Sequence, residues 1–72
     1  MVLFRKTRET EQEVEYIFGD TSPDRSLTIH KADGTYQVAD GREDHALLAA
    51  IRRIRGRAKA ENAWPTFGAI QA

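Results

Sequence analysis

The chain has 72 residues, of which 31% are charged, with 11 acidic residues, 11 basic residues and no cysteine. This length predicts a single domain over 1–72, and the lack of cysteine excludes disulfide scaffolds, thiolate metal sites and thiol nucleophiles. No apolar run approaches the roughly 20 residues that span a bilayer, and the N-terminus becomes charged too early for a signal peptide. We therefore expect a soluble, cytoplasmic protein.

The first part of the chain predicts two strands, over 2–6 and 13–18. In the second strand, apolar residues alternate with glutamates from Glu13 to Phe18, which places an apolar side on the core and an acidic side in water. A helix there would bring glutamates into repelling i,i+4 pairs. The next residues, 19–24, are rich in turn formers and predict a loop.

A hairpin is the clearest local signal. Asp33-Gly34, a dipeptide favoured in type I′ turns, separates strands predicted over 26–32 and 35–39. A two-residue turn at this dipeptide would set Ile29 opposite Val38. The alternation of the two strands also places four apolar side chains on one face, namely Leu27, Ile29, Tyr36 and Val38.

One helix is predicted over 41–61. Asp40 and Glu43 have the spacing of a capping box. Apolar residues then recur at helical intervals, as Leu47, Ile51, Ile54 and Ala58. Gly56 costs about 1 kcal/mol relative to alanine inside a helix, but the good helix formers after it favour a helix that continues and ends near Asn62.

The C-terminal segment, 63–72, carries no charge and holds two of the six aromatic residues. A disordered tail would be polar, so we predict an ordered, extended tail that begins with Trp64-Pro65. Trp64, Phe67 and Ile70 either seal the core of this small domain or contact a partner. Together these elements predict an α+β fold, a three- or four-stranded antiparallel β-meander with one C-terminal helix packed on one face and an extended tail.

Three segments in this order carry a resemblance, namely Glu13-Val14-Glu15-Tyr16-Ile17-Phe18-Gly19-Asp20, the Asp33-Gly34 hairpin, and Ala63-Trp64-Pro65-Thr66-Phe67-Gly68. In this respect most of the chain resembles short uncharacterised proteins of actinobacteria. That group has no assigned activity, so the resemblance implies only a stand-alone bacterial protein.

Few residues could support catalysis or metal binding. His30 is predicted on the outer face of the sheet, and His45 on the outer side of the first helical turn. The acidic neighbours of His45 do not face it on a helix, because residues one or two apart point in different directions. The chain has no phosphate-binding glycine loop, nucleophile elbow or zinc-protease motif. We therefore expect a non-enzymatic protein with no catalytic residue, cofactor or metal.

The helix carries five basic residues within eight positions, namely Arg52, Arg53, Arg55, Arg57 and Lys59. Such a patch suits contact with nucleic-acid phosphates. The zero net charge, the acidic stretch over 9–24 and the absence of a predicted outward aromatic favour a solvated helix face instead. A nucleic-acid-associated regulator is therefore the alternative prediction.

The preferred prediction is an accessory or protein-interaction module whose partner is another protein or a second copy in a homodimer. Ile17 is predicted to project among polar neighbours on the sheet face that one helix leaves uncovered. We do not expect membrane binding, because the helix lacks bulky residues on its apolar face. The candidate partner contacts are Glu13, Glu15, Ile17, Trp64 and Phe67.

Overall fold

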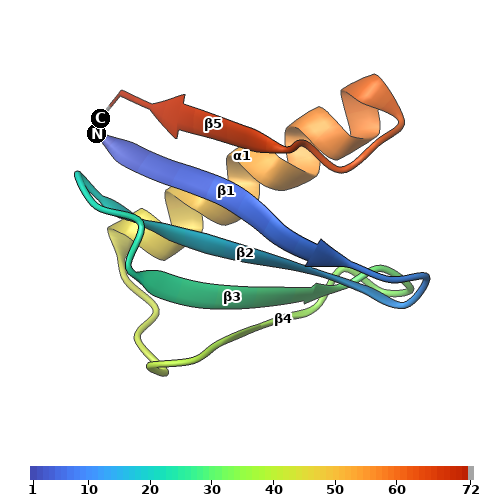
Figure 1. Ribbon diagram of the computed structural model, residues 1–72, viewed down its shortest axis with the longest axis horizontal. Helices are drawn as coiled ribbons and strands as arrows, with labels where there is room; N and C mark the ends of the chain where they lie inside the picture. The colour runs from blue at the N-terminus through green and yellow to red at the C-terminus, as the bar shows by residue number, and fades with distance from the viewer. Residues whose placement is uncertain (72) are drawn as a thin grey trace.

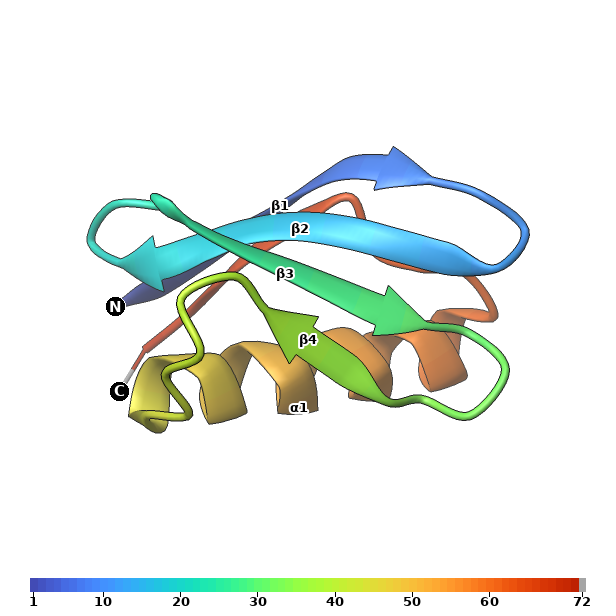
Figure 2. The same cartoon turned by 90° about the horizontal axis from the view of Figure 1, so that it is seen from below.

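The computed structural model describes residues 1–71 and has an α+β fold, as predicted, with one helix across one face of an antiparallel sheet (Figures 1 and 2). The elements in chain order are β1 (Val2–Glu9), β2 (Glu13–Asp20), β3 (Arg25–His30), β4 (Tyr36–Val38), α1 (His45–Glu61) and β5 (Phe67–Ile70). The five strands lie in the order β4-β3-β2-β1-β5.

The sheet has one strand more than predicted, because part of the tail forms β5. This strand pairs antiparallel with β1, with Val2 opposite Ile70. The chain crosses from one edge of the sheet to the other through α1, so the sheet is not a simple meander (Figure 1). β1 and β2 are also longer than predicted. Gly19 and Asp20 belong to β2 rather than to the loop, and β1 continues past a bulge at Thr7.

The predicted register of the β3–β4 hairpin was wrong by two residues. Ile29 lies opposite Tyr36 rather than Val38. The connection has four residues, because the His30 amide donates to the Thr35 carbonyl at 2.8 Å. A type I′ turn needs two consecutive residues with positive φ, and at this turn only Gly34 has one, at 74°. A shift of two residues leaves every side chain on its predicted face.

The core is a single layer of side chains between the sheet and α1, as the alternation predicted. The buried residues are Val2, Phe4, Val14, Tyr16, Phe18, Leu27 and Ile29 from the sheet and Leu47, Ala50, Ile51 and Ile54 from the helix. The Tyr16 hydroxyl donates to the Pro65 carbonyl at 2.6 Å, which ties the segment before β5 to the core. Burial raises the pKa of this hydroxyl, so the hydroxyl keeps its proton and donates a hydrogen bond to the Pro65 carbonyl.

The helix begins later than predicted. Its N-cap is Asp44, whose carboxylate accepts a hydrogen bond from the Leu47 amide at 3.1 Å. Asp40 is not the cap, because its carboxylate binds Arg25 and the Arg42 amide instead. The prediction that the helix continues past Gly56 is confirmed, and the helix ends at the left-handed C-cap Asn62.

Arg25 fastens the segment before α1 to the sheet. Its guanidinium donates to Asp40 at 2.7 Å, to Asp44 at 2.8 Å and to the Arg42 carbonyl at 3.0 Å. The same group lies 4.6 Å from the centroid of the Phe18 ring. Only 11% of the Arg25 side chain is exposed, so this ion pair is largely shielded from solvent on its cationic side. We call Arg25, Asp40 and Asp44 the arginine clasp.

The tail seals the core only in part. Trp64 and Ile70 pack against the core, whereas Phe67 is 68% exposed. Gly68 lies opposite Phe4, and a Cβ atom at this glycine would come within 2.5 Å of the Phe4 ring. The missing side chain of Gly68 therefore lets the Phe4 ring pack beneath β5.

Candidate functional site: the open face of the sheet

The face of the sheet that points away from α1 carries no helix in the part of the chain that the structure describes (Figure 2). On this open face, Arg5 lies between Phe67 of β5 and Ile17 of β2 in one cross-strand row. The next row places Leu3 beside Ala69. We call these five residues the open-face patch.

The open-face patch combines exposed apolar surface with an unpaired charge. Phe67 is more exposed than the other exposed large hydrophobic residues, Met1 and Leu48, at 47% and 49%. Leu3 and Ile17 are half-buried. Arg5 is exposed and has no ion-pair partner among residues 1–71. A guanidinium between apolar side chains can pack its flat face against a partner and donate hydrogen bonds at its rim.

The other half of the open face is charged but internally paired. Arg8 donates to Glu13 at 2.6 Å and to Glu15 at 2.7 Å, and these contacts, chiefly that with Glu15, raise the pKa of Arg8. His30 lies 3.9 Å from the Glu13 carboxylate. Both glutamates therefore lie on the predicted face, but Arg8 offsets much of their charge.

The structure brings only some of the predicted partner contacts together. Ile17 and Phe67 flank the same arginine, whereas Trp64 packs against the core on the helix side. Sequence reasoning missed Leu3, Arg5 and Ala69. Leu3 and Arg5 could have been found from the sequence pattern, because they alternate with buried residues in β1. Ala69 depends on the pairing of β5, which no local pattern revealed.

The basic helix patch is smaller than its sequence suggested. The Arg55 guanidinium donates to the Gly34 carbonyl and lies 5.7 Å from the Tyr36 ring centroid. Arg57 donates to the Phe67 carbonyl at 2.7 Å and to Glu61 at 3.0 Å. Three exposed bases have neither an ion pair nor a side-chain hydrogen bond in the described chain, namely Arg52, Arg53 and Lys59.

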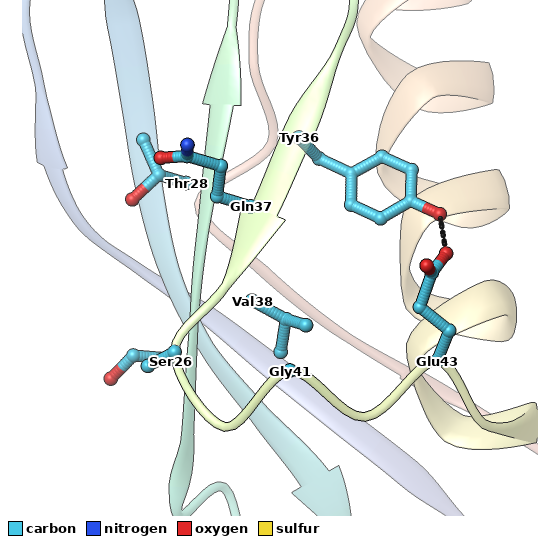
Figure 3. A pocket seen from close by; sticks show the side chains of 8 residues that line it. Ser26, Thr28, Tyr36, Gln37, Val38, Gly41 and Glu43 are labelled. Atoms are coloured by element: carbon cyan, nitrogen blue, oxygen red, sulfur yellow. Dashed lines mark hydrogen bonds between the residues drawn. The ribbon is translucent and has the colours of Figure 1, made fainter.

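A hollow of about 500 Å³ lies beside the free edge of β4 (Figure 3). Ser26, Thr28 and Gln37 point to one side of β4, and the Tyr36 side chain points to the other, toward Glu43. The Tyr36 hydroxyl donates to Glu43 at 2.7 Å, and this hydrogen bond raises the pKa of the phenol. A raised pKa makes the phenol a weaker acid, which is the opposite of activation for proton transfer near neutral pH.

The described residues provide neither a metal-binding cluster nor a membrane-spanning helix. Within residues 1–71, no three histidine, aspartate or glutamate side chains form a group that could hold a metal ion. His30 is half-buried on the open face and His45 is exposed at the start of α1. None of the described helical residues forms a helix with the length and apolar character needed to cross a membrane.

No protein-family model, curated protein or solved structure matches this chain. A functional proposal for it therefore starts from the chemistry of its surface.

Proposed function

We propose that this protein is a small, non-enzymatic interaction module of the bacterial cytoplasm, which serves as an accessory protein by binding a protein partner or a second copy through the open-face patch. One observation carries the proposal. Phe67, Arg5 and Ile17 form a continuous row on a sheet face that no helix covers in the described chain.

The chemistry of this row matches that of an interface centre. Aromatic and arginine side chains are enriched at protein interfaces and contribute a large share of their binding energy. Full burial of a phenylalanine side chain contributes about 1.5–3 kcal/mol, and Phe67 is two-thirds exposed before any partner binds. The paired charges of Arg8, Glu13 and Glu15 would form a polar rim beside this centre.

The proposal is tested by capture from an extract of the host with a tagged protein. We expect the wild type to retain a defined partner in a stoichiometric amount, and we expect Ile17→Ser and Phe67→Ser each to lose it. Circular dichroism and thermal unfolding would establish that both variants remain folded.

Gln37→Ser supplies the matched control, because Gln37 is exposed on the same sheet at β4, away from the patch. It should retain the partner. Equal capture by all four proteins, or capture by none of them, would contradict the proposal.

The alternative function, a nucleic-acid-associated regulator, is favoured by the three bases on the outer side of α1 that have no partner among residues 1–71. If Arg52, Arg53 and Lys59 contact phosphates, log affinity for duplex DNA or RNA should fall with log salt at a slope of about −3. Charge reversal at Arg52 and Arg53 should abolish the binding, whereas Arg5→Glu on the opposite side should not. No gel shift at low salt would rule out this alternative.

A further inference from the structure

The two edges of the sheet are protected to different extents. β4 has three residues, and the Val38 carbonyl on its free edge accepts from the Gly41 amide at 3.1 Å, so the following loop covers that edge. β5 carries no charged side chain and contains no proline. Charges, proline and covering loops are the usual features that prevent an edge strand from pairing with another chain. The residues of β5 itself supply neither a charge nor a proline.

The backbone groups that β5 leaves unpaired can be identified. The Thr66 carbonyl accepts from the Lys6 amide at 2.7 Å, so Thr66 hydrogen-bonds toward β1. Because the hydrogen-bonding direction alternates along a strand, the N–H and C=O groups of Phe67 and Ala69 point away from β1. Arg57 contacts the Phe67 carbonyl from that free side. A carbonyl oxygen has two lone pairs, so it can accept a second hydrogen bond while it keeps Arg57.

We infer that a second copy of this chain pairs with the free edge of β5, antiparallel across a twofold axis, and that the two sheets become one continuous sheet. The inference rests on the proposed function, since the pairing joins two open-face patches and so enlarges the surface that is proposed to bind a partner. An antiparallel strand that is identical to β5 presents the same outward groups in reverse order. The twofold axis would pass between the two Ala69 residues. The Ala69 N–H of each copy would then donate to the Ala69 C=O of the other, and Phe67 would lie opposite Gln71 of the second copy.

The side chains fit this register. Phe67 and Ala69 both point to the open face, with Phe67 exposed by 68%. Diagonal neighbours on paired antiparallel strands lie within reach of an aromatic ring, so each Phe67 ring can cover Ala69 of the other copy. The open-face patches of the two copies would then meet along one line and form a single, larger apolar surface.

Sedimentation tests the pairing first. Over about two decades of micromolar concentration, we expect the wild-type mass to rise from 8.1 kDa toward twice that value. Ala69→Pro removes only an N–H that points away from β1, at an edge position that tolerates proline, and should sediment as a folded monomer. If that variant fails to fold, Ala69→Lys replaces it, because two like charges placed directly opposite repel.

Cysteine trapping tests the register. The natural chain has no cysteine, so Ala69→Cys introduces a unique thiol. Opposite hydrogen-bonded residues have Cα atoms about 5.5 Å apart, which lies within the range of a disulfide. Mild oxidation should therefore link Ala69→Cys into a dimer much faster than Gln37→Cys on the opposite edge. Equal rates for the two variants would overturn the register.

A wild type that stays monomeric at every concentration, or a dimer that survives both Ala69→Pro and Ala69→Lys, would overturn the inference. These failures are separable from failure of the proposed function. Ile17 lies two strands away from the β5 edge, so Ile17→Ser should lose the captured partner and keep the dimer. A monomeric wild type that still captures a partner through Ile17 would leave the proposed function standing without the second copy.

Discussion

Gly19→Ala should lower the stability of this protein by about 2–3 kcal/mol, which is the upper part of the usual range for forcing extra atoms into a packed site. Gly19 is buried in β2, and a Cβ atom there would overlap the backbone carbonyl oxygen of Ser22 in the β2–β3 loop. A backbone carbonyl cannot rotate aside as a flexible side chain does, so the whole loop must move. Thermal unfolding should show a midpoint lower by roughly 10–20 °C.

Gly56→Ala is the matched control for this substitution. Gly56 lies inside α1, and a Cβ atom there would meet nothing within 4 Å. Alanine at this position should therefore raise stability by about 0.5–1 kcal/mol through its helix propensity. An unchanged midpoint for Gly19→Ala would mean that the β2–β3 loop does not lie over Gly19.

Arg25→Met should be strongly destabilising at neutral pH, because it breaks the arginine clasp. It removes the hydrogen bonds to Asp40, Asp44 and the Arg42 carbonyl, and with them the link between β3 and the N-terminus of α1. Arg42→Met is the control, because Arg42 also pairs with Asp44, at 2.9 Å, but its side chain is 68% exposed. Exposed ion pairs contribute little, so the control should unfold near the wild-type midpoint, and Arg25→Met well below it.

The clasp also predicts how stability depends on pH. Hydrogen bonds from Arg25 are the main reason that the pKa of Asp40 falls to about 2 and that the pKa of Asp44 is lowered. An aspartate in an unfolded chain has a pKa near 3.9, so these carboxylates stabilise the fold fully above about pH 4. That contribution is lost as the pH falls toward about 2, where Asp40 takes up its proton.

Acid titration of wild type and Arg25→Met would check this prediction. The wild-type midpoint should fall between about pH 4 and pH 2 more steeply than that of the variant. Glu9 and Asp33 also have lowered pKa values, through Lys31 and Thr35 respectively, and they titrate in both proteins. The difference between the two curves therefore isolates the clasp. Parallel curves would mean that Arg25 does not set the pKa values of Asp40 and Asp44.

The features that the sequence predicted correctly depend on neighbours along the chain. Alternation in β2 and β3 placed the right side chains on the core, and helical spacing placed Leu47, Ile51 and Ile54 there as well. The predicted register of the β3–β4 hairpin was wrong, although its side chains lie on the predicted faces. Alternation repeats every two residues and therefore cannot distinguish registers that differ by two residues.

The features that the sequence did not predict depend on contacts between distant residues. Asp40 has the spacing of a helix cap, but Arg25, 15 residues earlier, takes its carboxylate. Arg55 and Arg57 belong to the predicted basic patch, yet each donates to a carbonyl outside α1. In the candidate site, β5 pairs with β1 at a place where Gly68 leaves room for the Phe4 ring, and that contact joins residues far apart in the sequence.

The pairing of β1 with β5 has a consequence for biosynthesis. β1 leaves the ribosome before β5, so the Phe4 ring has no Gly68 to cover it until the four elements between these strands have been made. Contacts between such distant residues form only after a large loop has closed. Completion of the sheet therefore waits for the synthesis of β5, and until then β1 exposes an unpaired edge that a chaperone can shield.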